Sequence, residues 1–366
     1  MNAAGPFAPV DEAGLARAVI AARKVAVESY LDQFFASKRR EAAAVSAESD
    51  ELLAALQGFV LAGGKRIRAA LVAAGYRCFA PEPDDDRLPA AGAAVELLHA
   101  FLLAHDDVFD RDSTRHGQPT LHRVFRDAIV ARFPNADAER YGTSLAILAG
   151  DVAAMLAYDA LTEAAVAPDR LLRATRVLSH IAVQTGYGEA LDVLAELDPH
   201  VDAERVLLIH RYKTAKYTIE GPLHIGAVLA GADADQLAAL SRFAVPLGIA
   251  YQVQDDSIGV FGSEHVTGKP VGADLREGKR TLLSVHGLAG PHAAELATMI
   301  GRPDLDAKTV TRAQQLLRDG GALASSNARC KALVQEACAA LAELAVPAEM
   351  RTFLAGLLHL LVDRTA

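Results

Sequence analysis

A long apolar stretch that ends in three aspartates is the feature that most constrains this chain. Apolar residues with helical spacing run from 88 to 109, and the stretch closes on the sequence HDDVFD at 105–110. On a helix, Asp106 and Asp110 lie one turn apart on the same face, and Asp107 lies beside them. Neighbouring carboxylates repel one another, so the arrangement costs stability unless a cation binds there. The alternative is a solvated acidic helix end.

A second acid pair, Asp255 and Asp256, lies near the end of another long apolar helix. Two such helices can face one another across a bundle, where inward carboxylates commonly build metal sites. Mg²⁺ typically binds through one or two carboxylates together with substrate phosphates. We therefore predict a site in which several Mg²⁺ ions bridge the oxygens of one diphosphate. Its predicted metal ligands are Asp106, Asp107, Asp110, Asp255 and Asp256.

Basic residues near the two acid clusters are candidates for neutralising that diphosphate. Lys213 lies in the helical sequence YKT (212–214), and Lys269 and Lys279 lie in the sequence GKPVGADLREGKR (268–280). Arg115 follows the first acid cluster. Lys and Arg hold phosphate oxygens by charge-assisted hydrogen bonds. For each of these residues alone, the alternative is a surface side chain whose charged end reaches water.

Helical periodicity extends over nearly the whole chain, and no segment alternates with period two for long enough to predict a strand. Turns are short and carry Gly, Pro, Asn or Asp, as expected between helices. Ala and Leu dominate, aromatics are 5% and Trp is absent, which suits helix-on-helix packing. The predicted helices span 11–46, 50–62, a segment opened by 63–68 that runs to 78, 88–109, 119–132, 143–164, 169–186, 188–196, 203–230, 234–262, 278–290, 307–318, 326–344 and 347–364. We predict an all-α fold with a flexible N-terminal tail, 1–10, and one domain, 11–366.

Composition excludes several classes of partner and location. The net charge is −9 and no basic block is present, so a nucleic-acid partner is not expected. Cys78, Cys330 and Cys338 are scattered without metal-ligand spacing, which predicts reduced thiols in a cytoplasmic protein. The first residues lack the pattern of a signal peptide. No uninterrupted apolar stretch approaches the ~18 residues of a membrane span, so no transmembrane segment is expected.

Six motifs, in this order and spacing, resemble those of the trans-isoprenyl diphosphate synthases, the family of farnesyl and geranylgeranyl diphosphate synthases. The resemblance covers nearly the whole chain after the tail. It implies a single-domain helical bundle around a deep central cavity, the isoprenoid synthase fold, and a homodimer. The motifs are GGKRIR (63–68), HAFLLAHDDVFD (99–110), RHGQPTLH (115–122), YKT (212–214), YQVQDD (251–256) and GKPVGADLREGKR (268–280).

The same resemblance implies a reaction and a role for each site residue. Isopentenyl diphosphate condenses with an allylic diphosphate by ionisation, condensation and elimination, with Mg²⁺ and basic side chains stabilising the departing diphosphate. The released diphosphate takes the proton, and water must be excluded from the cation. The allylic diphosphate is assigned to Arg115, Lys213, Thr214, Gln252, Lys269 and Lys279 beside the aspartates. Isopentenyl diphosphate is assigned to Lys65, Arg68, His99 and, at a position where the family has Arg, His116.

Four positions depart from the family pattern. Ala69 replaces a Pro in a first helical turn, where little effect is expected. His116 in place of Arg predicts weaker or pH-dependent binding of isopentenyl diphosphate. Gly259 replaces the last aspartate of the second acid motif, which leaves the metals there to Asp255, Asp256 and water. Glu189 stands where the family often has Gln, and the sequence leaves the effect of this change open.

The length of the product is expected to depend on the residues below the first acid cluster. Phe101, five residues before Asp106, lies ~7.5 Å down the helix axis and corresponds to a common tunnel floor in the family. Leu102 lies more squarely below Asp106, and Leu98 lies one turn further down. The alternative for Phe101 is an ordinary core side chain. The large floor and the absence of a two-residue insertion favour a C20 product, geranylgeranyl diphosphate, with C15 as the nearest competitor.

Two rival classes are a terpene cyclase and a non-catalytic partner subunit on the same fold. A cyclase takes one substrate and needs no site for isopentenyl diphosphate, so the sequence GGKRIR and His99 argue against it. Both acid clusters and the three lysines argue against a non-catalytic subunit.

Overall fold

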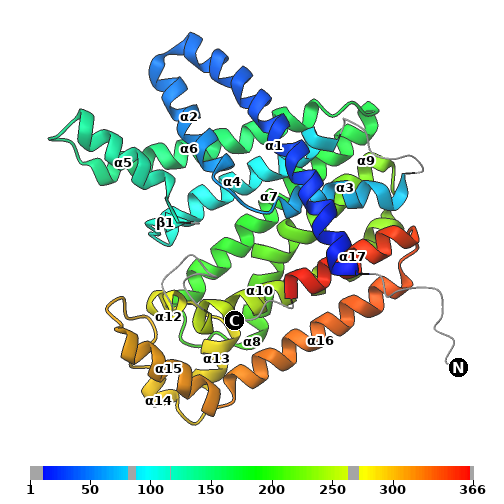
Figure 1. The fold of residues 1–366 in the computed structure, drawn as a ribbon. Coiled ribbons are helices and arrows are strands. Elements are labelled where there is room, and N and C mark those ends of the chain that lie inside the picture. The colour runs from blue at the N-terminus through cyan, green and yellow to red at the C-terminus, as the bar shows by residue number, and fades with distance from the viewer. Residues whose placement is uncertain (1–10, 81–87, 116, 263–271, 363–366) are drawn as a thin grey trace, which may run out of the picture.

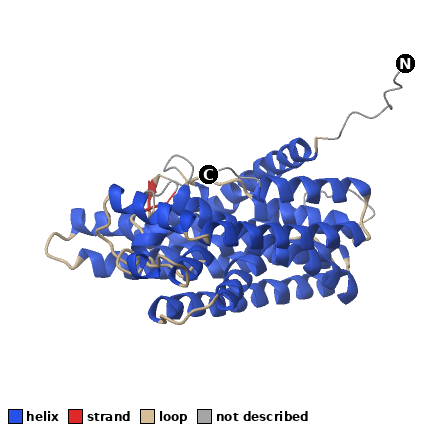
Figure 2. Cartoon of the chain, turned by 90° about the horizontal axis from the view of Figure 1, so that it is seen from below, coloured by secondary structure: helices blue, strands red, loops and turns tan. Residues whose placement is uncertain are grey.

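Almost all of the regular structure is helical, as the computed structural model of residues 11–80, 88–115, 117–262 and 272–362 shows (Figures 1 and 2). The predicted tail 1–10, His116 and Lys269 lie outside these ranges. The helices are α1 (Glu12–Val45), α2 (Ala47–Leu61), α3 (Ile67–Phe79), α4 (Leu88–Phe109), α5 (Leu121–Arg132), α6 (Ala138–Thr162), α7 (Pro168–Leu197), α8 (Ala203–Ile209), the π-helix η1 (His210–Glu220), α9 (Gly221–Ala230), α10 (Ala234–Phe261), α12 (Ala273–Glu277), α13 (Leu282–Leu288), α14 (Ala293–Leu296), α15 (Ala307–Asp319), α16 (Ala322–Glu343) and α17 (Ala348–Val362). The all-α prediction is confirmed.

Helix α4 is a central element of the bundle. It packs most extensively on α6 and also contacts α1, α3, α5 and α9. Its small residues allow close approach, since a side chain at Gly92 would lie 3.1 Å from the Ala69 Cβ of α3. Ala69 is buried there in the first turn of α3, which accommodates the departure from Pro at this position.

Two helices, α4 and α6, are long and apolar enough to span a membrane by length and composition. Core helices of a bundle share these properties, and 67% of the apolar window in α4 is buried inside the fold. Helix α4 also carries the first acid cluster at its end. Its hydropathy is therefore explained by packing in the bundle.

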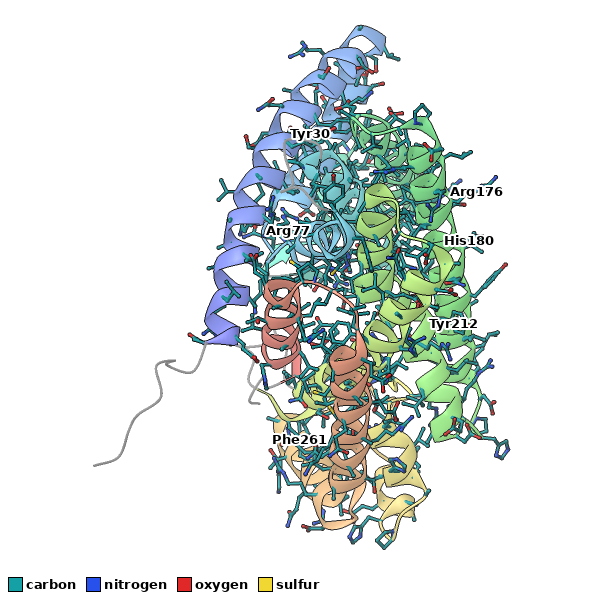
Figure 3. The ribbon with its side chains drawn as sticks, turned by 90° about the vertical axis from the view of Figure 1, so that its right-hand side faces the viewer. Tyr30, Arg77, Arg176, His180, Tyr212 and Phe261 are labelled. Carbon is teal, nitrogen blue, oxygen red and sulfur yellow. The ribbon has the colours of Figure 1, made fainter. Side chains whose placement is uncertain are left out.

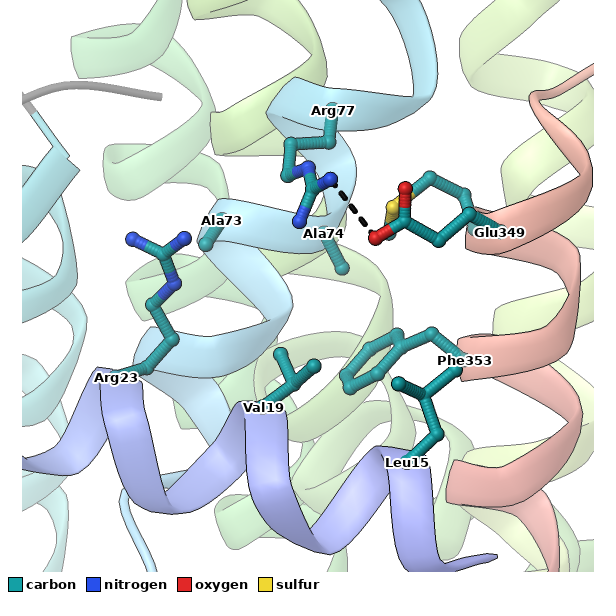
Figure 4. Close-up of a pocket in the computed structure, with 9 residues that line it drawn as sticks. Leu15, Val19, Arg23, Ala73, Ala74, Arg77, Glu349 and Phe353 are labelled. Atoms are coloured by element: carbon teal, nitrogen blue, oxygen red, sulfur yellow. Dashed lines mark hydrogen bonds and ion pairs between the residues drawn. The ribbon is translucent and has the colours of Figure 1, made fainter. Parts of the chain in front are cut away.

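Helices α1, α3 and α17 pack against one another. Tyr30 in the middle of α1, labelled in Figure 3, donates a hydrogen bond to Glu163 at the end of α6. Near the start of α1, Arg77 of α3 donates a hydrogen bond of 2.9 Å to Glu349 of α17 (Figure 4). The crevice beside this pair has a volume of only about 10 Å³ and is lined mainly by apolar side chains, so it is a packing defect.

Several predicted helix boundaries are wrong, and each has a local physical reason. A break was expected between 186 and 188, but α7 continues through these residues, and Gly188 stands inside the helix where η1 approaches closely. A side chain at Gly188 would lie 2.6 Å from the Tyr212 carbonyl carbon. The helix expected at 278–290 begins only at Leu282, because Gly278 has a left-handed backbone (φ 77°) and a capping box at Thr281 starts α13.

Other boundaries differ by a few residues. Helix α6 begins at Ala138, where the Asp137 side chain caps it, and α16 begins at Ala322. The helix expected at 203–230 is continuous, but its middle turns are the π-helix η1. A short antiparallel pair, β1 (Thr114–Arg115) and β2 (Gln118–Pro119), was not predicted because each strand has only two residues.

Candidate active site

A cavity of about 1530 Å³ lies between the ends of α4 and α10 and the faces of η1, α7 and α12. The predicted site residues that line it are Lys65, Arg68, His99, Leu102, Asp106, Asp110, Arg115, Lys213, Thr214, Gln252, Asp255, Asp256 and Lys279. Residues of both acid clusters therefore line one cavity, although the clusters lie about 150 residues apart in the chain.

The first acid cluster is held by cations from three other segments. The Arg115 guanidinium donates to Asp106 at 2.9 Å, and the Lys213 ammonium lies 3.2 Å from the same carboxylate. Lys279 donates to Asp110 at 2.6 Å. Burial opposes ionisation of Asp106, but Lys213, Arg115 and Lys279 outweigh it and lower the pKa of this carboxyl to about 2. Asp106 is thus an ionised carboxylate in the cavity throughout the neutral range.

Asp107 differs from its two neighbours, because its side chain is not among those that line the cavity. It is only 1% exposed, and its Oδ1 accepts a hydrogen bond of 2.6 Å from the Arg115 Nε. Burial raises the pKa of Asp107 to about 6, against the opposing effect of Arg115. The contact fixes Arg115 in the orientation that also reaches Asp106.

Lys213 is surrounded by carboxylates. Its ammonium lies 3.0 Å from Glu189, 2.7 Å from Asp192 and 3.2 Å from Asp106. Burial disfavours the charged ammonium, but these carboxylates outweigh it and hold the pKa of Lys213 above its ordinary value. Glu189, whose role the sequence left open, is thus a partner of Lys213. Burial raises the pKa of Glu189 to about 7.

The π-helix η1 connects Lys213 to the second acid cluster. The Thr214 hydroxyl donates to the Gln252 side-chain oxygen at 2.8 Å, and the Gln252 amide donates to Asp256 at 2.8 Å. The other oxygen of Asp256 lies 3.0 Å from the His210 Nε2, one turn before Thr214. His210 was missed by sequence analysis, because it is buried and belongs to no predicted motif.

The turn of the GGKRIR motif presents the second group of cations. Gly63 and Gly64 adopt positive φ values, as does Arg66 (φ 52°), a conformation that favours glycine. Arg66 is held there by hydrogen bonds to Glu28 at 3.1 Å and to the Val60 carbonyl at 2.6 Å. Its buried guanidinium therefore anchors the turn from which Lys65 and Arg68 reach the cavity.

Arg68 and His99 meet at Tyr217 of η1. The Arg68 guanidinium lies 4.6 Å from the centre of the Tyr217 ring, and the His99 ring lies 5.9 Å from it. Arg68 also donates to the Thr218 hydroxyl at 3.0 Å. Tyr217 and Thr218 were missed by sequence analysis, although they lie one turn beyond the predicted YKT motif.

The three predicted chain-length residues lie in different environments. Leu102 lines the cavity, and Leu98 is 2% exposed in the core. Phe101 does not line the cavity, and its ring packs edge-on against His105 at 4.9 Å between centres. Leu103, which was not predicted, does line it. The sequence spacing placed Leu102 correctly because it lies one turn before Asp106.

No three Asp, Glu, His or Cys side chains within the described ranges converge closely enough to hold a metal ion by themselves. Asp106 and Asp110 at the end of α4 and Asp255 and Asp256 of α10 instead line the same cavity. Such a donor set fits an ion that completes its coordination with phosphate oxygens.

The chain matches the polyprenyl synthetase family model over residues 49–317. It belongs to the polyprenyl synthetase family. The chain is 34% identical over 324 residues to a geranylfarnesyl diphosphate synthase of Aeropyrum pernix, and the match covers 87% of this chain and 96% of that protein. It is 38% identical over 264 residues to a geranylgeranyl diphosphate synthase of Mycobacterium tuberculosis, covering 70% and 69% of the two chains.

A solved structure confirms the fold of this polyprenyl synthetase. The geranylgeranyl pyrophosphate synthase from Corynebacterium glutamicum, complexed with isoprenyl diphosphate and magnesium, superposes with a TM-score of 0.88 at 32% identity. The match covers 94% of this chain and 98% of that chain. The polyprenyl synthetase is therefore a prenyltransferase that acts by trans-prenyl condensation, and the predicted family and isoprenoid synthase fold are confirmed.

Proposed function

We propose that this enzyme condenses isopentenyl diphosphate with allylic diphosphates and releases geranylgeranyl diphosphate. The observation that carries the proposal is the meeting of both acid clusters and two separate groups of cations in one cavity. The allylic diphosphate binds between the acid clusters, beside Arg115, Lys213 and Lys279. Isopentenyl diphosphate binds at Lys65, Arg68 and His99, where the cavity offers cations and no acid pair. Lys269 and His116, outside the described residues, stay predicted contacts.

Mg²⁺ fits the carboxylates of this cavity. The proposed ligands are Asp106, Asp110, Asp255 and Asp256, since all four line the cavity as hard oxygen donors. The metal role of Asp107 stays a prediction, because its side chain lies behind Arg115. When bound, the ions supply Lewis-acid stabilisation of the leaving diphosphate.

The protein's own side chains complete the reaction. Arg115, Lys213 and Lys279 neutralise the charge that develops on the leaving diphosphate. Their carboxylate partners hold them in place before substrate binds, so no reorganisation is needed at the moment of reaction. The Thr214 and Gln252 dipoles lie beside the acid cluster and steady the allylic cation. The released diphosphate then takes the proton lost in the elimination.

Product analysis by mass spectrometry tests this function. Isopentenyl diphosphate is supplied with the C5, C10 and C15 allylic diphosphates in turn, and we expect the C20 diphosphate to accumulate from each. Dominant C15 product would support the farnesyl alternative. Hydrocarbon or alcohol released from an allylic diphosphate alone would indicate a terpene cyclase, and no product with any pair would indicate a non-catalytic subunit.

Removing the side chains below the first acid cluster is expected to lengthen the product. Leu102→Ala opens the cavity directly, and Phe101→Ala removes the bulk that packs beside it. We expect both variants to form C25 or longer products, with the larger shift for Leu102→Ala, because only Leu102 lines the cavity. Reversed-phase analysis of the dephosphorylated products measures this. An unchanged product length in both variants would show that the floor lies elsewhere.

Arg68→Ala is expected to weaken binding of isopentenyl diphosphate selectively. Loss of a charge-assisted hydrogen bond costs about 1.5–3 kcal/mol, which raises the KM for this substrate about 10- to 100-fold. The KM for the allylic substrate should change less than about threefold, because the side chains that Arg68 contacts are Tyr217 and Thr218 and not the aspartates. Steady-state kinetics with each substrate varied in turn gives both values. Equal effects on both substrates would contradict the assignment.

We also propose that the enzyme is a homodimer that works in the cytoplasm. Exposed apolar residues form a stripe on each of two neighbouring helices. On α6 and α7 these residues are Tyr141, Leu148, Met155, Leu172, Val183, Tyr187, Leu194 and Leu197. Figure 3 shows that the side chains of Arg176 and His180, also in α7, point away from the bundle. The scattered cysteines support the cytoplasmic location. The net charge of −9 supports the expectation that the enzyme has no nucleic-acid partner.

The oligomeric state is measured by light scattering after gel filtration. We expect twice the chain mass of 38.6 kDa for the wild type and a single chain mass for Leu148→Glu combined with Met155→Glu. The control is Val25→Glu, at an exposed apolar residue of α1 away from the stripes. A monomeric wild type would contradict the proposal.

A further inference from the structure

The space beside Gly259 is filled by a carboxylate from another helix. A side chain built at Gly259 would overlap the carboxylate of Asp274 in α12 and would lie 3.2 Å from its Cγ. The three nearest atoms to that side chain all belong to the Asp274 carboxyl group. The backbone brings the two residues together, because the Gly272 N–H donates to the Gly259 carbonyl at 3.3 Å.

Position 259 lies on the face of α10 that carries the second acid cluster. It follows Asp255 by four residues, so a side chain there would stand one helical turn from Asp255 on the same face. Gly259, Asp255 and Asp274 all line the cavity. The Asp274 carboxylate therefore occupies the place that a longer side chain at 259 would fill, and it faces the same space.

We propose that Asp274 supplies the third carboxylate of the second acid cluster. The inference rests on the proposed function, because it requires a metal–diphosphate assembly beside Asp255. Mg²⁺ keeps several water ligands in such sites, and a bound ion with its water ligands would be held by Asp274 together with Asp255 and Asp256, which line the same cavity. One acid motif is thus completed from two helices, with two aspartates from α10 and one from α12.

A competing role for Asp274 is to hold Lys279. Burial of Lys279 disfavours its ammonium, but Asp110, Asp274 and Glu277 outweigh burial and hold the pKa of Lys279 well above its ordinary value. Glu277 of the same helix lies 3.2 Å from the Lys279 ammonium, yet it does not line the cavity. Glu277 therefore offers a matched control, since it also raises the pKa of Lys279 but does not lie beside Gly259.

Calorimetric titration of Mn²⁺ in the presence of inorganic pyrophosphate tests the inference on the whole enzyme, without turnover. We expect Asp274→Asn to weaken Mn²⁺ binding about 10-fold or more, as loss of an outer-shell carboxylate does in other metal sites. Glu277→Gln should weaken it less than about threefold. Equal weakening in both variants would show that Asp274 acts only through Lys279.

Moving the carboxylate from position 274 to position 259 gives the sharper test. Gly259→Asp alone should weaken Mn²⁺ binding, because its side chain overlaps the Asp274 carboxylate and the two charges repel. Gly259→Asp combined with Asp274→Ala should restore the affinity to within about threefold of the wild type. A double variant no better than Asp274→Ala alone, with a wild-type circular dichroism spectrum, would overturn the inference.

Asp255→Asn separates this inference from the function on which it rests. If Asp255→Asn leaves Mn²⁺ binding unchanged, the metal role of the second cluster fails altogether. If Asp255→Asn weakens binding and Asp274→Asn does not, only the role of Asp274 fails.

Discussion

Asp106→Asn should lower turnover about 100- to 1,000-fold or more, because it removes a proposed ligand of the Mg²⁺ that would stabilise the leaving diphosphate. Asp106 is the cavity carboxylate that two cations hold at once, Arg115 at 2.9 Å and Lys213 at 3.2 Å. With a pKa of about 2 it is ionised throughout the neutral pH range. The loss should appear in kcat at saturating metal and substrates.

The matched control for Asp106→Asn is Asp112→Asn. Asp112 also lies near Arg115, at 3.6 Å, but it does not line the cavity. Its replacement should lower turnover less than about 10-fold, since one charge near Arg115 is lost while the metal-binding face stays intact. If Asp106→Asn kept a tenth of the wild-type turnover, the carboxylate would have no central part in catalysis.

Lys213→Met should abolish most activity and also destabilise the fold by about 2–4 kcal/mol, because it leaves buried carboxylates without their shared cation. Asp106, Glu189 and Asp192 all lie within 3.2 Å of this ammonium. The side chain of Met has a similar length, so the cavity shape is largely kept and the lost charge dominates. Thermal or urea unfolding measures the loss of stability.

The sign of the pH dependence follows from these contacts. Without Lys213, the pKa of Glu189 rises further above its present value of about 7, so the folded protein takes up protons more readily than the unfolded chain. Protonation relieves the repulsion, and the stability difference between the variant and the wild type should be smaller at pH 6 than at pH 8. The double variant Lys213→Met, Glu189→Gln should recover part of the loss at pH 8. A deficit that grew as the pH fell would contradict this account.

The sequence could predict what depends on spacing within one helix. Asp106 and Asp110, Asp255 and Asp256, and the glycines of GGKRIR are each placed by local geometry, and all reach the cavity as expected. Leu102 was likewise placed by its distance along α4. Helical periodicity and short turns were enough to predict an all-α bundle, because each helix needs an apolar face whatever its partners are.

What the sequence could not predict depends on contacts between distant segments. His210 meets Asp256, and Asp192 meets Lys213, only through the packing of η1 against α10 and α7. Gly188 resembled a helix stop, yet it lies inside α7 where this helix and η1 approach each other closely. Gly259 resembled a missing ligand, and only the fold shows that Asp274 lies in its place. Phe101 satisfied the family spacing, but its ring packs on His105 beside the cavity.

The central claim is that both acid clusters hold one diphosphate through divalent ions. Crystals of the enzyme grown with Mn²⁺ and inorganic pyrophosphate allow the ions to be located by anomalous scattering. We expect Mn²⁺ peaks next to Asp106 and Asp110 and next to Asp255, all in contact with a single pyrophosphate. Mn²⁺ at only one of the clusters, or pyrophosphate bound away from both, would contradict the claim.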